Sequence, residues 1–177
     1  MALGATIYKV SLSVADIDRH YYNDFDLTIA QHPSENDLRM MVRLIAFALH
    51  ADESLSFTKG LSQEDEPEVW QKNYGGEIEL WIDIGQPDEK RIRKACGRSE
   101  QVIIYTYSHK AADAWWRQNE CKFRRFKNLH VIHLNFAGDP ESLIERSMQL
   151  QCNIQDCELL LLDERENSVS VTREVWE

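Results

Sequence analysis

A chain of 177 residues is long enough to bury a substantial core and fits within one domain. Its hydrophobic content of 43% excludes a disordered chain, and no apolar run approaches the roughly 20 residues that span a bilayer. A net charge of −10 argues against indiscriminate binding to nucleic acid, because phosphates attract basic surfaces. The first residues alternate like a strand and do not resemble a secretion signal. We expect a cytoplasmic monomer without a membrane segment.

The N-terminal region has the alternation of β-strands. Residues 6–14 (TIYKVSLSV) and 24–30 (DFDLTIA) place apolar side chains at every second position. The polar connection between them predicts an antiparallel ribbon.

The strongest helical pattern covers residues 33–53 (PSENDLRMMVRLIAFALHADE), where apolar residues form one stripe. Ser34 and Asp37 have the spacing of a capping box, which predicts that Ser34 caps this helix. Charged residues spaced four positions apart follow along a neighbouring face: Glu35, Arg39 and Arg43.

The middle of the chain predicts a hairpin followed by an alternation of helices and strands. After a short strand near residues 54–62, segments 66–73 and 76–85 pair across a turn at Tyr74 and Gly75. A helix begins near Pro87 and ends at Gly97. The later elements are a buried strand (101–107), a helix capped by Ser108 (109–120), a strand (129–136), a short helix (about 140–147) and three strands (148–155, 157–163 and 168–176).

This order predicts one α/β (α+β) domain over residues 1–177, with a mixed central β-sheet flanked by helices. Its four cysteines are expected to be free thiols, and their spacing together with the histidines does not complete a zinc site. His130 and His133 lie three residues apart on a predicted strand, so they face opposite sides of the sheet.

The predicted hairpin carries acidic side chains on one face. If Asn73 pairs with Gly76, Glu66 stands opposite Asp83. Two carboxylates so close repel each other, and a cation such as Mg²⁺, which prefers oxygen ligands, relieves the repulsion. The alternatives are a solvated outer face, and a register slip that separates the two acids. Trp70 and Trp81 on this face are either covered by a helix or form a stacking platform for bases.

Three segments in this order resemble the YaeQ family: HPSENDLRMMVRLIAFAL, DEPEVW and LWIDIGQPDEKRIRKAC. The resemblance covers nearly the whole chain, starting with the MALGATIYK opening. It implies a fold similar to PD-(D/E)XK nucleases, the restriction-endonuclease-like core of helix, three strands, helix and strand. Here this core covers about residues 34–136, with additional antiparallel strands at both termini. The resemblance implies a fold and does not by itself imply an activity.

Carried over residue by residue, the nuclease pattern implies metal ligands at Glu35, Glu66 and Asp83. Pro67 follows Glu66 here, whereas the pattern places its proline before the acid. The pattern also requires a lysine two residues after Asp83, where this chain has Gly85. Some nucleases of this fold supply the cation from the following helix, which makes Lys90, Arg91 and Lys94 the candidates, with Lys94 preferred.

Two functions are therefore compared. The first is a Mg²⁺-dependent nuclease, in which the three acids hold the metal and Lys94 supplies positive charge to the transition state. The second is a catalytically degenerate nuclease-fold protein, an interaction or binding module that keeps an acidic cleft for a protein partner or a bound ion; nucleic acid is the partner that the first function requires. The acids in their correct order favour the first, whereas Gly85 and the net charge favour the second.

Overall fold

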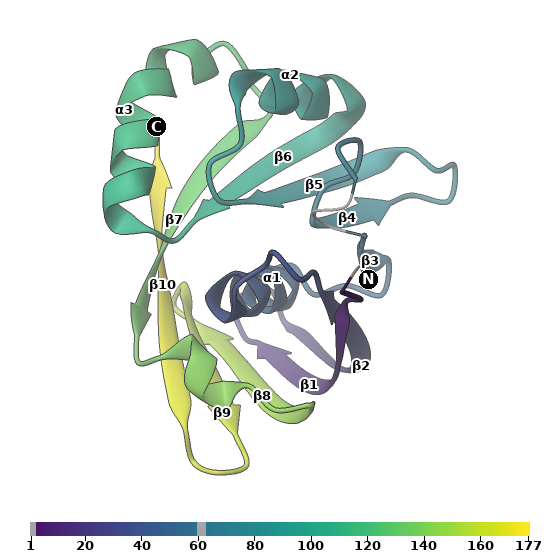
Figure 1. Cartoon of the computed structure of the whole chain (residues 1–177). Helices are drawn as coiled ribbons and strands as arrows, with labels where there is room; N and C mark the ends of the chain where they lie inside the picture. The colour runs from purple at the N-terminus through teal and green to yellow at the C-terminus, as the bar shows by residue number, and fades with distance from the viewer. Residues whose placement is uncertain (1–2, 60–62) are drawn as a thin grey trace. The chain divides into compact units, whose positions relative to one another are not determined.

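The computed structural model describes residues 3–59 and 63–177, and these contain ten β-strands and three α-helices (Figure 1). The elements in chain order are β1 (Thr6–Asp16), β2 (Tyr21–Gln31), α1 (Asp37–Leu49), β3 (Leu55–Phe57), β4 (Val69–Lys72), β5 (Ile78–Ile84), α2 (Glu89–Arg98), β6 (Ser99–Thr106), α3 (His109–Phe123), β7 (Leu129–Ala137), the 3₁₀-helix η2 (Pro140–Leu143), β8 (Ser147–Gln155), β9 (Glu158–Asp163) and β10 (Ser168–Trp176). The mixed α and β composition predicted from the sequence is confirmed.

The elements divide into two units. The first contains Met1–Ala51 and Asn135–Arg173, and the second contains Asp52–Leu134 and Glu174–Glu177. Strands β7 and β10 each begin in one unit and end in the other. The single domain over residues 1–177 stays a prediction.

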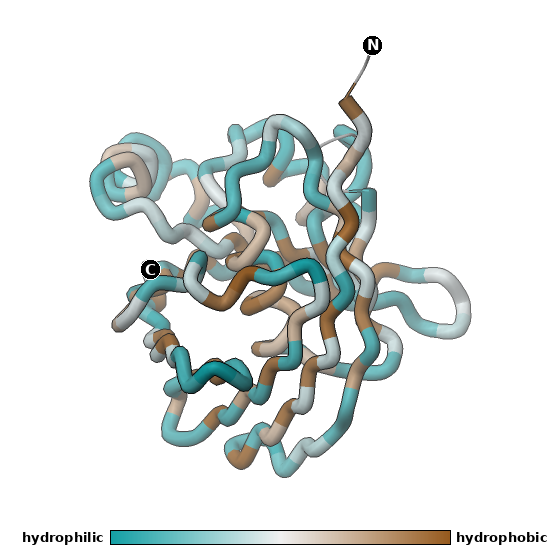
Figure 2. The backbone as a smooth tube through the Cα atoms, turned by 60° about the horizontal axis from the view of Figure 1, so that its bottom comes forward, coloured by the Kyte–Doolittle hydropathy of each residue, from teal (hydrophilic) through white to brown (hydrophobic). Residues whose placement is uncertain are grey.

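In the first unit, the strands follow the order β2, β1, β8, β9, β10. Strand β1 pairs with β2 in antiparallel fashion and with β8 in parallel, which confirms the predicted N-terminal ribbon. Helix α1 packs its apolar stripe on this sheet, where the rings of Phe25 and Phe47 meet edge to face with centroids 5.3 Å apart. Hydrophilic and hydrophobic residues alternate along the strands, as the two-residue period requires (Figure 2).

The start of α1 differs from the prediction. Asn36 caps the helix, and its side-chain oxygen accepts a hydrogen bond from the backbone N–H of Arg39 at 2.8 Å. The Ser34 hydroxyl instead lies 2.6 Å from Nδ1 of His32, so the predicted Ser34 cap is wrong. Glu35 therefore precedes the helix and does not form part of it.

In the second unit, β5, β6 and β7 are parallel neighbours, and β4 and β3 extend the sheet beyond β5 in antiparallel fashion. Helices α2 and α3 cover one face, and the core between them and the strands includes Trp81, Ile92, Ala95, Val102, Ile104, Phe123 and Val131. Trp81 is 1% exposed, so it is covered by packed elements and offers no stacking platform.

The hairpin between β4 and β5 has another register than the one predicted. Asn73 pairs with Glu77 across a three-residue loop in which Gly76 takes a φ of +84°. A bulge between Gln71 and Lys72 adds a further shift, so Val69 stands opposite Ile82. The predicted opposition of Glu66 and Asp83 is wrong, because Glu66 lies before the first residue of β4.

Three smaller predictions also differ from the structure. Helix α2 continues through Gly97 and ends at Arg98, because the chain passes directly into β6. Helix α3 extends to Phe123, and the short helix predicted near residues 140–147 is the four-residue 3₁₀-helix η2. In the part of the chain that the structure describes, no helix is long and apolar enough to cross a membrane.

The end of α1 places a histidine in a positively charged, desolvated position. Burial, with smaller contributions from the charges of Arg19 and Arg173, lowers the pKa of His50 from 6.5 to about 4, whereas the charge of Asp16 opposes this shift. A folded-state pKa below the unfolded value means that the unfolded chain binds more protons between these two pH values. Stability contributed by neutral His50 is therefore lost as the pH falls from about 6.5 to about 4.

We expect the free energy of unfolding to decrease by up to about 3 kcal/mol through His50 over this pH range, since one pKa unit corresponds to about 1.4 kcal/mol. Urea unfolding of the wild type and His50→Gln at several pH values measures the contribution of His50 to the free energy of unfolding. The variant should have the shallower pH dependence, because its side chain does not titrate. Parallel pH curves for the two proteins would contradict the assignment.

Candidate functional site

In the second unit, Asp83 near the end of β5 forms a paired contact with an arginine. Asp88 caps α2 and accepts a hydrogen bond from the backbone N–H of Arg91 at 2.8 Å, which places Arg91 in the first turn. Its Nε and Nη2 donate to the two carboxylate oxygens of Asp83, both at 2.8 Å. Asp83 is 2% exposed. Bidentate arginine–carboxylate pairs are among the strongest hydrogen-bonded contacts in proteins.

The same guanidinium also holds the acidic loop before β4. Nη1 of Arg91 donates to the carbonyl of Glu64 at 2.9 Å, and Nη2 donates to the carbonyl of Glu66 at 2.7 Å. Glu66 is thus brought to the group around Asp83 by its backbone carbonyl. Arg91 joins β5, α2 and this loop through four hydrogen bonds.

The preferred cation of the sequence prediction, Lys94, has a different contact. Its ammonium group pairs with Asp65, and both side chains are exposed. The hydrogen bond and the charge of Lys94 lower the pKa of Asp65. Lys90 is also exposed, so among the three candidate cations it is Arg91 that meets Asp83. A catalytic role of Lys94 stays a prediction.

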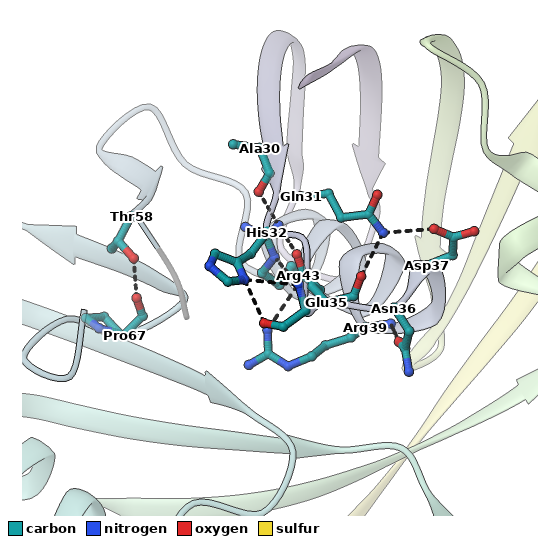
Figure 3. Close-up of polar contacts among 11 residues, drawn as sticks. Ala30, Gln31, His32, Glu35, Asn36, Asp37, Arg39, Arg43, Thr58 and Pro67 are labelled. Carbon is teal, nitrogen blue, oxygen red and sulfur yellow. Dashed lines mark hydrogen bonds and ion pairs between the residues drawn. The ribbon is translucent and has the colours of Figure 1, made fainter. Parts of the chain in front are cut away.

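In the first unit, Glu35 is held by two arginines of α1 (Figure 3). Nε and Nη2 of Arg43 donate to its two carboxylate oxygens, both at 2.8 Å, and Nη1 of Arg39 donates at 3.0 Å. Arg43 also donates to the carbonyl of Ala30 at 2.8 Å. Glu35 and Arg43 are 7% and 3% exposed, so this is a buried ion pair.

The spacing that predicted contacts along α1 is confirmed for Glu35 and Arg39. Arg43 lies eight residues after Glu35 and still reaches it, because long helical side chains lean toward the N-terminus of their helix. Two guanidinium groups against one carboxylate leave this cluster with a net positive charge.

These contacts determine whether the acids fit Mg²⁺. Both oxygens of Asp83 and both oxygens of Glu35 accept hydrogen bonds from guanidinium groups, which neutralise the carboxylates and repel a divalent cation. Within residues 3–59 and 63–177, no group of three or more His, Cys, Asp or Glu side chains is arranged to hold a metal. The residues in this arrangement do not fit Mg²⁺. The convergence of Glu35 with Glu66 and Asp83 stays a prediction, since Glu35 belongs to the other unit.

The backbone conformation at position 85 explains why this chain has Gly85 where the nuclease pattern has a lysine. Its φ is +93°, a left-handed conformation that is strained for other residues, and its N–H donates to the carbonyl of Tyr105 at 2.9 Å. A Cβ at this position would meet no atom within 4 Å, so the constraint is backbone conformation and not crowding.

Sequence reasoning missed Glu68 as a buried acid. Glu68 is 4% exposed, and its backbone N–H donates to the carbonyl of Ile82 at 3.0 Å. Four acids occur within residues 64–68, and the hairpin register decides which of them is buried. The loop length and the bulge between Gln71 and Lys72 together set this register.

A second missed group lies at the carboxyl end of β6, where Thr106 stands opposite His133 in the middle of β7. His133 is 2% exposed, and its ring nitrogens lie 2.7 Å from the Thr106 hydroxyl and 3.1 Å from Nδ1 of His109. Trp176 stacks on its ring at 4.8 Å between centroids. Burial and the charge of His109 lower the pKa of His133. The signal was that His109 follows closely after the end of β6, while His133 lies beside that end on the neighbouring parallel strand.

Comparisons with known proteins identify the family. The family model described as YaeQ protein matches residues 1–172. The chain belongs to the YaeQ family. The YaeQ protein of Escherichia coli (strain K12) is 46% identical over 179 residues, which cover 100% of this chain and 98% of that relative. The YaeQ protein of Salmonella typhi is 45% identical with the same coverage.

Two solved YaeQ structures are similar to the whole chain. The protein of Xanthomonas axonopodis pv. citri is 44% identical and superimposes with a TM-score of 0.91 over 98% of each chain. The protein of Pseudomonas syringae is 29% identical, with a TM-score of 0.89 over 98% of this chain and 96% of the other. The names of these relatives state no activity.

The buried pair in α1 predicts unequal roles for its two arginines. Arg43→Ala leaves the partly exposed Arg39 as the ion-pair partner of Glu35. We expect this variant to lower the free energy of unfolding by about 3 kcal/mol. Arg39→Ala leaves the bidentate pair intact and should cost about 1 kcal/mol or less. Urea unfolding at neutral pH measures both variants, and equal losses would contradict the assigned geometry.

Proposed function

We propose that this YaeQ protein acts by binding, on a PD-(D/E)XK nuclease-like scaffold in which guanidinium groups stand where a nuclease holds a metal ion. The observation that carries the proposal is the bidentate contact of Arg91 with buried Asp83. A metal ligand must present its oxygen lone pairs to the ion, and those of Asp83 already accept from Arg91.

The order of elements supports the nuclease-like part of this proposal. Helix α1 is followed in the chain by three antiparallel strands, β3 to β5, then by α2 and β6. This is the order of helix, three strands, helix and strand that the family resemblance implies. Strands β1 and β2 precede this order, and β8 to β10 follow it, as expected for additional strands at both termini.

The chemistry of phosphodiester hydrolysis supports the binding part. Metal-dependent hydrolysis needs a cation that activates water and neutralises the charge that develops on the phosphate. Gly85 supplies no side chain for this task, and Lys94 is paired with Asp65 at the surface. Arg91 already directs four hydrogen bonds to protein oxygens.

A Mg²⁺-dependent nuclease is the second candidate, because Asp83 lies at the end of the third core strand where the nuclease pattern has its acid. This function requires Arg91 to leave Asp83 when metal or substrate binds. The two candidates therefore differ in one measurable property, the affinity of Asp83 for a divalent cation.

Calorimetric titration with Mg²⁺ and Mn²⁺ distinguishes them. We expect wild type and Asp83→Asn to give the same heats, because Asp83 contributes no metal site while Arg91 holds it. The variant Arg91→Ala should gain weak Mn²⁺ binding, because it frees the carboxylate. Arg93→Ala is the matched control, since Arg93 lies on the same helix and is exposed.

A cleavage assay on single- and double-stranded DNA and RNA completes this experiment. The binding proposal predicts no cleavage by wild type with either metal. The nuclease would replace this proposal if the wild type bound metal and cleaved a substrate, and if Asp83→Asn abolished both metal binding and cleavage.

A further inference from the structure

The positive charge of this acidic protein is concentrated in one stretch of the chain. Residues 90–127 contain eleven of the 20 Lys and Arg residues and only three of the 30 Asp and Glu residues, so their net charge is +8 in a protein of net charge −10. This stretch comprises nearly all of α2, all of α3 and the loop after it. An acidic protein thus carries a local surface suited to a polyanion.

Contacts within the second unit join these cations into one surface. Glu89 in the first turn of α2 pairs with Lys122 and Arg125 near the end of α3, so the two basic segments lie side by side. Four further cations lie within four residues of these three in the sequence and are exposed, on α2 and on the loop after α3: Lys90, Arg93, Arg124 and Lys127. Among the described residues, none forms an ion pair with these four. We call them the basic surface.

An aromatic pocket opens beside Arg124. Its volume is about 120 Å³, and its lining includes Trp116, Arg124, Phe126, Trp176 and Glu177. The rings of Trp116 and Trp176 lie 5.8 Å apart at an angle of 42°. Trp176 is held in place by its stack on His133, at 4.8 Å between centroids. The pocket therefore presents a pre-positioned aromatic ring next to the basic surface.

We propose, resting on the binding role above, that this part of the second unit binds single-stranded nucleic acid, with a base in the aromatic pocket and the adjoining phosphates on the basic surface. Proteins that bind single strands combine a positive path with aromatic rings on which bases stack. Arg124 belongs to both features, because it lines the pocket and is one of the four exposed cations.

The composition of the pocket favours a base over a phosphate as its occupant. Trp116, Phe126 and Trp176 offer aromatic surface, and the Glu177 carboxylate would repel a phosphate but accept a hydrogen bond from an exocyclic amine. A duplex keeps its bases stacked inside and cannot fill the pocket without unpairing. An acidic peptide would satisfy the cations and leave the pocket empty.

Fluorescence anisotropy with labelled oligo(dT) and oligo(U) of about 12 nucleotides tests this assignment, because single-strand sites cover about 4–16 nucleotides. The buffer contains EDTA, so metal-dependent chemistry plays no part. We expect binding that weakens steeply between about 50 and about 200 mM salt. Arg124→Ala and Lys127→Ala should each weaken binding a few-fold and reduce the salt slope by about 0.7.

Trp176→Ala should weaken binding about 10-fold and leave the salt slope unchanged, because stacking carries no net charge. Trp176→Phe keeps a ring in the pocket and should retain most of the affinity, which separates stacking from a loss of folding. Lys9→Ala is the control for charge, since Lys9 is an exposed cation of the first unit.

Several outcomes would overturn the inference: no binding at about 50 mM salt, equal affinity for a duplex or for poly-glutamate, or a loss in Lys9→Ala as large as in Arg124→Ala. If no oligonucleotide binds and the wild type and Asp83→Asn still give the same heats with Mg²⁺ and Mn²⁺, this inference is overturned but the proposed binding function is not. Metal uptake with cleavage would instead overturn the proposed function.

Discussion

A carboxylate removed from water must be paired, and this requirement organises both candidate clusters of the protein. Transfer of an isolated charge into a protein interior costs several kcal/mol, and one well-aligned arginine offsets much of that cost. Asp83 and Glu35 are each matched by a guanidinium that donates to both of their oxygens. Arg91 also orders the loop before β4, because two backbone carbonyls of that loop accept hydrogen bonds from the same side chain.

The same pairing occupies the carboxylate oxygens that a metal ligand would present to an ion. A divalent cation and a guanidinium compete for the same carboxylate oxygens, and only the guanidinium is built into the protein. Gly85 has a left-handed backbone and no side chain, so in the proposed function it supplies no charge where the nuclease pattern has a lysine. What the second unit offers a ligand is instead a basic surface and an aromatic pocket, which suit recognition of a flexible polyanion.

Periodicity and local spacing predicted most of the elements and part of the site. The alternation of apolar residues identified the strands, and the spacing of Glu35 and Arg39 predicted their contact. Asn36 and Ser34 are both good capping residues, and the path of the chain into α1 selected Asn36. The hairpin register could not be predicted, because one extra loop residue and one bulge move Glu66 away from Asp83. The choice between Arg91 and Lys94 likewise depends on how α2 packs against β5, which spacing along one helix does not reveal.

Crystals of the protein grown with Mn²⁺ and measured near the manganese absorption edge test the central claim most directly. The claim predicts no anomalous peak at Asp83 and an unbroken bidentate contact with Arg91. A manganese ion at about 2.2 Å from a carboxylate oxygen of Asp83, with Arg91 displaced, would contradict it.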